Sequence, residues 1–331
     1  MSGTGWTIVT SMGGRDRDCV NFVPVISYRP TPRAVCLAAV AIMLVGVVIL
    51  VLPCGRNDQP LDGRTSDLLV EVQQFALTMS ADSGYARPTS VERTAVGDGV
   101  GWLLDNRPNE AAEVLSKVGY AVREQTDTGT RRTFYEISDT ATTPRGWGRI
   151  MVDPAATSTR LGIEIPYPDD DQDSESLGVQ LFRRVPGSIL VIAGAHRRAA
   201  SDRQADMAHT TDSVFEEVHA LLVDRHIPVM QLHGFQNVIA PDSDVLVSAG
   251  PQLRNPYVEA IAQRLESVGL SVCRPWIAGC PGLEATTNVQ AWWSDEHGAD
   301  FAHIEVSSTM RGTASYRGLV VAALAAQAAS R

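Results

Sequence analysis

Apolar residues along the chain alternate between short runs and longer segments with helical spacing. The short runs are β-branched or alternate with polar residues, which predicts strands at 134–138, 148–153, 161–168, 188–195, 228–235, 244–250, 270–276 and 301–307. In other segments apolar residues recur every three or four positions, which predicts helices at 67–81, 110–118, 177–182, 213–222 and 256–269. This order of elements predicts an α/β fold whose mostly parallel, mixed sheet has helices on both faces.

One apolar segment stands apart because it is long and uncharged. Residues 34–52 contain no charged side chain, and at about 1.5 Å per helical residue they cover the hydrocarbon core of a bilayer. A buried core helix of this length would show polar residues on one face, and this segment has no polar face. We therefore expect a transmembrane anchor at residues 34–53, as a helix preceding the α/β domain.

The charges on either side of this segment predict its orientation. Arginines precede it at positions 15, 17, 29 and 33, whereas arginine and aspartate are mixed after it. Because positive charges favour the cytoplasmic side, we expect a single-pass protein of the cell membrane with a cytoplasmic tail at 1–33. Residues 54–66 would be a linker and 67–331 an extracytoplasmic domain, with an N-terminal lobe at 67–150. A cleaved signal peptide is the alternative, although its apolar region is usually only about 7 to 15 residues long.

Charge and cysteine content narrow the possible partners and the compartment. The formal net charge is −10, and residues 169–175 form an acidic cluster that would repel phosphate, so nucleic acid is not an expected partner. Two cysteines, Cys273 and Cys280, lie in the predicted outer domain. In an oxidising compartment they could form a disulfide, and two free thiols are the alternative.

Histidines follow or lie within three of the predicted strands. His196 follows the strand at 188–195, His233 lies near the end of 228–235, and His303 lies in 301–307. Because side chains alternate between the two faces of a strand, His303 and Glu305 share one face. An edge strand with one solvated face would show the same pattern.

The ordered series QLHGF, DVLVSAG, ESVGLSV, TTNVQ and HIEVSSTMR resembles the poly-gamma-glutamate hydrolase-like branch of the zinc carboxypeptidase fold. The N-formylglutamate amidohydrolases are a more distant likeness, through the strand ending in LHGF and the arginine-rich turn after GAH. The similarity covers roughly residues 162–311. It implies a zinc-dependent hydrolase of amide bonds.

The resemblance also implies roles for individual residues. It makes His233 a zinc ligand and Glu305 the general acid or base beside the metal-bound water. Asn288 and Arg311 would contact the carbonyl and carboxylate groups of the substrate, and His196 and Arg197 are further candidates for substrate binding. The acidic zinc ligand would come from the segment after residue 166, as Asp170 or Asp171.

The sequence departs from the family pattern at the first zinc-binding motif. Tyr167 stands where a histidine ligand is expected, and tyrosine, with a pKa near 10, is a poor replacement. His196 or His209 could substitute as a ligand. The alternative is that His196 and Arg197 bind substrate or Asp206, and that His209 caps a helix that begins near Asp212.

Two functions follow as expectations. The first is a membrane-anchored, extracytoplasmic metal-dependent amidohydrolase that acts on carboxylate-rich peptides, of the cell-wall or gamma-glutamyl type. The second is a catalytically degenerate relative that serves as an anchored peptide- or wall-binding module. A serine hydrolase is disfavoured because the sequence has no G-x-S-x-G motif.

Overall fold

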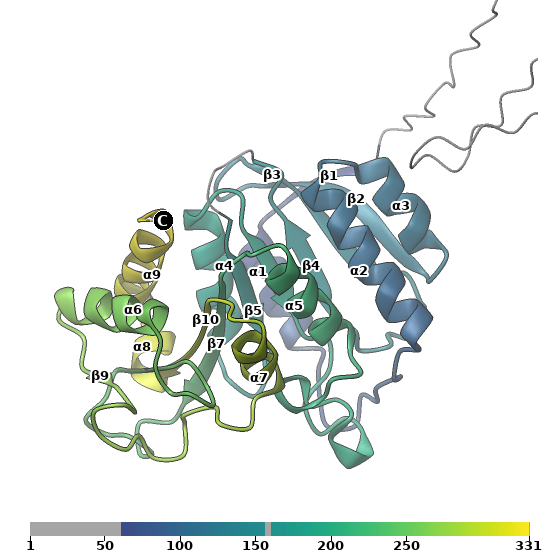
Figure 1. The fold of residues 1–331 in the computed structure, drawn as a ribbon. Helices are drawn as coiled ribbons and strands as arrows, with labels where there is room; N and C mark the ends of the chain where they lie inside the picture. Colours follow the sequence, from purple (N-terminus) through teal and green to yellow (C-terminus); the bar gives the residue numbers. More distant parts are fainter. Residues whose placement is uncertain (1–60, 156–159, 331) are drawn as a thin grey trace, which may run out of the picture. The chain divides into compact units, whose positions relative to one another are not determined.

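The computed structural model describes residues 61–155 and 160–330 (Figure 1). The expected tail and anchor, and most of the expected linker, lie outside these residues. Among the helices that are described, none combines the length and the apolar character needed to cross a membrane.

The described residues form one large sheet of ten strands in the order β1-β2-β3-β4-β6-β5-β7-β10-β8-β9. The strands are β1 (Gly63–Ser66), β2 (Tyr120–Asp127), β3 (Thr133–Asp139), β4 (Arg149–Val152), β5 (Gly162–Ile165), β6 (Ile189–Ile192), β7 (Val229–Phe235), β8 (Val245–Ser248), β9 (Val272–Cys273) and β10 (Phe301–Ser307).

Both parallel and antiparallel pairs occur in the sheet. The central strands β6, β5, β7 and β10 are mutually parallel, and parallel pairs also join β1 to β2 and β8 to β9. The pairs of β2 with β3, β3 with β4, β4 with β6 and β10 with β8 are antiparallel. The prediction of a mixed α/β sheet is confirmed.

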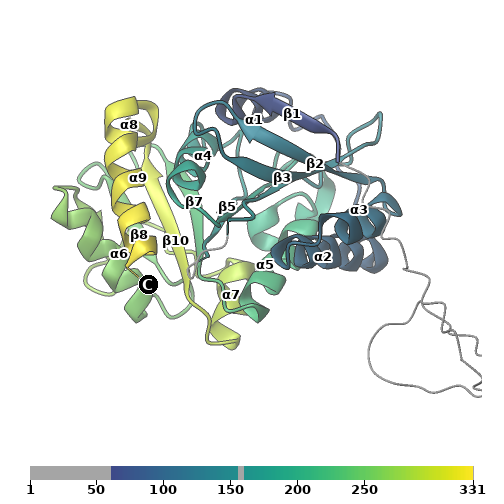
Figure 2. The same ribbon diagram turned by 90° about the horizontal axis from the view of Figure 1, so that it is seen from above.

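Helices pack on both faces of this sheet, as Figure 2 shows from above. The helices are α1 (Leu68–Ala76), α2 (Ser90–Leu104), α3 (Pro108–Ser116), α4 (Ser174–Arg184), α5 (Val214–Asp224), α6 (Pro256–Ser267), α7 (Val289–Glu296), α8 (Ser308–Gly312) and α9 (Ala314–Ala329), with short 3-10 turns at Ser201–Arg203 and Met207–His209. One apolar core joins the sheet to α1, α4, α6, α8 and α9, and a second joins it to α2, α3, α5 and α7. Two buried faces explain why a central strand such as β6 is apolar throughout.

Strand β10 lies inside the sheet, between β7 and β8, and all seven of its residues are buried. Ala302, Ile304 and Val306 pack in the α4–α9 core, and Phe301 packs in the other core. The predicted alternation of faces is therefore confirmed, and the edge-strand alternative is wrong. The polar side chains of β10 need partners inside the protein.

The N-terminal part of the domain extends the same sheet. Strands β2, β3 and β4 pair in sequence, and β4 joins them to β6. Strand β1, within the stretch expected to be a linker, pairs with β2. At the opposite edge a disulfide joins Cys273 to Cys280, whose Cα atoms are 6.1 Å apart, so the free-thiol alternative does not hold in this structure.

Candidate functional site

A cavity of about 290 Å³ lies at the carboxyl ends of the central parallel strands, the edge at which sheets of this type bind ligands. Its walls come from β7, β10, the loop before α7, and the segments that follow β5 and β6. The lining residues are Tyr167, Arg197, Ala208, His209, His233, Gly282, Leu283, Glu284, Ala285, Thr286, Thr287, Asn288, His303 and Glu305.

His233 and Glu305 face this cavity from neighbouring parallel strands. They are register partners in the pairing of β7 with β10, so their side chains project from the same face of the sheet. His303 lies two residues before Glu305, and its ring centroid is 4.4 Å from that of His233. The structure therefore brings together the two residues that the family resemblance assigns to either side of a metal-bound water.

Two polar atoms in this group are buried without a hydrogen-bond partner among the described residues. They are Oε2 of Glu305 and Nδ1 of His303. The other nitrogen of His303, Nε2, lies 3.2 Å from Glu305 Oε1, so the two side chains hold each other in place. Buried polar groups normally have partners, so both atoms indicate a ligand-binding position.

Gln231 determines which ring nitrogen of His233 carries the proton. The Gln231 amide nitrogen donates to Glu164 at 3.0 Å, which leaves its Oε1 as an acceptor for Asn288 Nδ2 at 2.6 Å and His233 Nε2 at 2.9 Å. His233 therefore carries its proton on Nε2 and presents the lone pair of Nδ1. Burial, and then the neighbouring His303, lower the pKa of His233 to about 3, so the ring is neutral.

Asp171 lies opposite the free nitrogen of His233. Its Oδ2 is 3.3 Å from His233 Nδ1. Burial raises the pKa of Asp171 to about 7, despite the opposing charge of Arg311. A protonated Asp171 can donate to this nitrogen.

Tyr167 is held by a different set of partners. Its hydroxyl donates to Asp206 and lies 3.3 Å from His209 Nδ1, while its ring packs edge-on against His233 at a centroid distance of 5.2 Å. Burial and the charge of Asp206 raise the pKa of Tyr167, so the hydroxyl stays protonated. His209 Nδ1 also bonds Asp206 at 3.0 Å, whereas Ser213 caps the following helix, α5.

Asp170 pairs with two residues of the segment after β6, His196 and Arg197. Arg197 Nε lies 2.6 Å from its carboxylate, and His196 Nε2 lies 3.2 Å from it. His196 accepts a backbone hydrogen bond from Arg198 through Nδ1, and it is not among the residues that line the cavity. Arg197 does line the cavity, and its side chain is half exposed.

Arg311 and Asn288, the other two candidates for substrate binding, differ in position. The Arg311 guanidinium is buried and donates to the backbone carbonyls of Gln172, Phe235 and Val306. It does not line the cavity. Asn288 does line it, and also caps α7 by accepting from the Ala291 backbone at 2.9 Å.

The donor groups present do not complete the zinc site that the family resemblance implies. A catalytic zinc ion normally has three protein ligands. His233 and Asp171 could supply two, but Tyr167, in the expected histidine position, bonds Asp206 instead. Within residues 61–155 and 160–330, no group of three His, Cys, Asp or Glu side chains could hold a metal ion. The residues therefore do not fit a three-ligand zinc centre.

Behind the cavity lies a buried network that the sequence did not reveal. His219, to which no role was assigned from the sequence, is fully buried; its Nδ1 bonds Glu164 at 2.8 Å and its Nε2 bonds Ser294 at 3.0 Å. Glu164 also accepts from Gln231, so the network reaches His233. The one feature of the sequence that could have indicated this network is Glu164, a carboxylate within an otherwise apolar strand.

Comparison with known proteins finds no matching family model and no matching curated protein. Among solved structures, gene product Atu2144 of Agrobacterium tumefaciens aligns at 11% identity and a TM-score of 0.39, over 55% of this chain and 92% of that one. A metallo-carboxypeptidase of Burkholderia cenocepacia aligns at 12% identity and 0.36, over 64% and 66%.

The tripeptide-bound cell shape determinant Csd4 of Helicobacter pylori aligns at 14% identity and a TM-score of 0.33, over 51% of each chain. The neighbours thus include proteins of metallo-carboxypeptidase type.

Proposed function

We propose that this domain is a peptide-binding module whose cleft has the layout of a metallopeptidase active site but holds no catalytic zinc. The observation that carries the proposal is the hydroxyl of Tyr167 bonded to Asp206 in the expected position of a zinc ligand. Because that hydroxyl is protonated and already has a partner, a third metal ligand is missing beside His233 and Asp171.

The cavity has the groups that a peptide with a free carboxylate requires. Arg197 is half exposed at the wall, and the N–H groups that its ion pair with Asp170 leaves unused can donate to a carboxylate. Glu305 Oε2 is an unpaired acceptor that can take an amide N–H from the peptide backbone. A carboxylate-rich peptide, of the cell-wall or gamma-glutamyl type, fits these groups.

The location of the domain is part of the proposal. The uncharged segment at residues 34–53 would anchor the chain in the cell membrane, and the arginines before it would keep the N-terminus in the cytoplasm. The binding module would then face the cell wall. Protease added to intact cells should digest the domain, and protection until the membrane is opened would contradict this orientation.

A metal-dependent amidohydrolase is the second candidate, and one specific observation favours it. Glu305 retains a free carboxylate oxygen in the cavity on the strand next to His233, as a general base would. A binding module has no chemical need for a base at this position, although it can use the same oxygen as an acceptor.

One experiment separates the two candidates. Full-length protein in detergent is incubated with a gamma-glutamyl dipeptide, with zinc and with a chelator, and both binding and cleavage are measured. The binding module predicts association in chelator and an intact dipeptide in both conditions. Zinc-dependent cleavage that Glu305→Gln abolishes would establish the amidohydrolase instead.

A further inference from the structure

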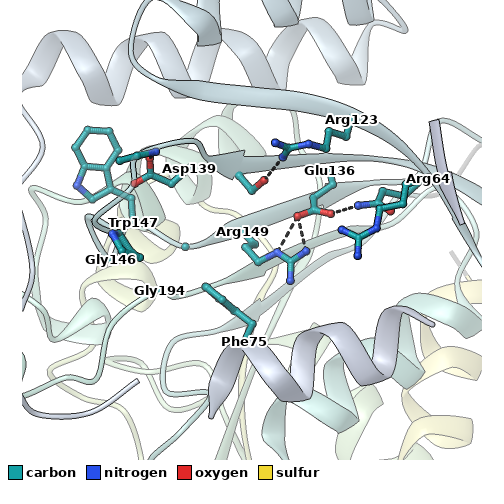
Figure 3. A pocket seen from close by; sticks show the side chains of 14 residues that line it. Arg64, Phe75, Arg123, Glu136, Asp139, Gly146, Trp147, Arg149 and Gly194 are labelled. Carbon is teal, nitrogen blue, oxygen red and sulfur yellow. Dashed lines mark hydrogen bonds and ion pairs between the residues drawn. The ribbon is translucent and has the colours of Figure 1, made fainter. Parts of the chain in front are cut away.

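A second cavity, of about 390 Å³, lies in the N-terminal part of the sheet (Figure 3). Its polar wall comes from β1 to β4, whose residues Arg64, Arg123, Gln125, Glu136, Ser138 and Arg149 line it. Phe75 of α1 supplies apolar surface, whereas Trp147 lies at the far end with its ring stacked on Tyr120 in the other core.

This pocket is separate from the His233 cavity. Its lining residues on β2, β3 and β4 alternate with Val122, Ile137 and Ile150, which pack in the α2–α5 core. Those lining residues therefore project from the opposite face of the sheet, the side of α1. Glu305 lies on the other face, together with Phe301 of that same core. No residue is shared between the two cavity walls.

Most of the charges in the pocket are already paired. Arg149 Nε donates to Glu136 at 2.8 Å, and the second oxygen of Glu136 accepts from Gln125. Arg64 pairs with Glu71 at 3.1 Å. Asp139 at the far end is paired with Arg145 at 2.9 Å.

Arg123 is the exception. Its Nη1 donates to Ser138 Oγ at 2.8 Å, and in the described part of the chain no carboxylate lies within ion-pair distance of it. A guanidinium has five N–H donors, so most of its donor capacity is left for a ligand. Three arginines of the wall therefore carry a positive charge. Glu71 balances that of Arg64 and Glu136 balances that of Arg149, so the charge of Arg123 is left without a counter-ion.

Gln125 provides a second, independent observation. It is 1% exposed, it lines the pocket beside Arg64, and its Oε1 is buried without any hydrogen-bond partner in the described residues. Its Nε2 is fixed on Glu136, so the unpaired atom is the acceptor. An N–H donor is the group that this atom lacks.

We propose that this pocket binds a small carboxylate that also carries an amide N–H, such as an N-acylated acidic amino acid or the end of a short acidic peptide. The carboxylate pairs with Arg123, the N–H donates to Gln125, and the aliphatic part packs on Phe75. With an acceptor and apolar surface beside the unbalanced cation, the pocket suits this ligand better than inorganic phosphate, which has no carbon skeleton and no N–H donor for Gln125.

The test is calorimetric titration of full-length protein in detergent with N-acetylglutamate. Arg123→Gln should weaken binding at least about tenfold, the effect of losing one charge-assisted contact. Arg64→Gln, a change at a largely exposed side chain, should weaken it less. Arg184→Gln, at an exposed arginine of α4 outside the pocket, is the matched control and should leave the dissociation constant unchanged.

Further ligands test each part of the assignment. N-acetylglutamine amide lacks the carboxylates and should not bind, whereas glutarate lacks the N–H and should bind several-fold more weakly than N-acetylglutamate. Equal binding of glutarate would overturn the role of Gln125, and equal binding of inorganic phosphate would show a general anion site instead.

The His233 cavity could also bind a carboxylate, so the titrations are repeated in Arg197→Gln. The Arg123→Gln effect should persist in that background, which makes this proposal independent of the proposed function. If Arg197→Gln alone abolishes binding, or if wild-type protein does not bind N-acetylglutamate, the second pocket is not the site.

Discussion

Glu305 and His233 are register partners on adjacent parallel strands, and both side chains enter the same cavity. This pairing places the two residues that the family resemblance assigns as metal ligand and as general acid or base in one cavity. Tyr167, bonded to Asp206, stands where that resemblance expects a further metal ligand.

Replacement of Tyr167 by histidine should create zinc affinity. The ring of Tyr167 is next to that of His233, so an imidazole there would add a third donor to His233 and Asp171. Elemental analysis should find about one zinc ion per chain in Tyr167→His and almost none in the wild type. Tyr167→Phe removes the hydroxyl without adding a donor and is the control. Stoichiometric zinc in the wild type would contradict the account.

Asp171 should make stability depend on pH. Burial raises its pKa to about 7, so between about pH 4 and pH 7 the folded chain keeps a proton that the unfolded chain releases. Asp171 therefore lowers the free energy of unfolding progressively as the pH rises from about 4 to about 7. Above about pH 7 its contribution no longer changes with pH. Asp171→Asn removes this dependence.

Urea unfolding of the wild type and of Asp171→Asn at several pH values measures the effect. The wild-type free energy minus that of the variant should fall by a few kcal/mol between pH 4 and pH 7 and then stay constant. Asp242→Asn, at an exposed aspartate, is the matched control. A difference that does not change with pH would show that Asp171 is ionised in the fold.

Loss of His219 should be strongly destabilising. Its fully buried ring bonds Glu164, so His219→Ala leaves a buried carboxylate with one partner fewer. Breaking a buried ionic pair costs roughly 3–5 kcal/mol. Adding Glu164→Gln should recover part of this loss, because the remaining group is then neutral. The free energy of unfolding in urea measures both variants, and equal loss in the single and double variants would argue against the pairing.

The disulfide should be present in protein secreted to the oxidising side of the membrane. Intact mass should be lower by two hydrogens than after reduction. Since Cys273 and Cys280 close a short loop, Cys280→Ser should lower the free energy of unfolding by about 2–3 kcal/mol in the loop-entropy model. Two thiols that react freely in untreated protein would contradict this pairing.

The central strands and the His233–Glu305 edge could be predicted because they depend on local pattern. Runs such as Ile189–Ile192 are apolar on both faces, and the alternation in β10 separates His303 and Glu305 from Ala302 and Ile304. Parallel pairing then brings strand ends to one edge.

Strand β2 and helix α2 could not be predicted, because neither shows a clear hydrophobic pattern. Strand β2 reads YAVREQTD, because Arg123 and Gln125 line a pocket and do not pack in a core. Helix α2 contains several glycines, and at Gly99 a Cβ atom would lie 2.5 Å from the Leu115 side chain of α3. Its helical form depends on this close packing, which propensity does not predict.

The partners of Tyr167 and His219 could not be predicted for a related reason. Asp206 lies 39 residues from Tyr167, and Glu164 lies 55 residues from His219. These contacts exist only once the sheet edge has formed. Sequence therefore identified the unusual residue at 167 but not what holds it.

The central claim is that the cleft binds a peptide without zinc. Calorimetric titration of full-length, chelator-treated protein with a gamma-glutamyl dipeptide tests this most directly, with Arg197→Gln beside the wild type and Arg184→Gln as control. The account predicts saturable binding without metal, at least about tenfold weaker in Arg197→Gln, with the dipeptide recovered intact. Binding that appears only with zinc, together with cleavage of the dipeptide, would contradict it.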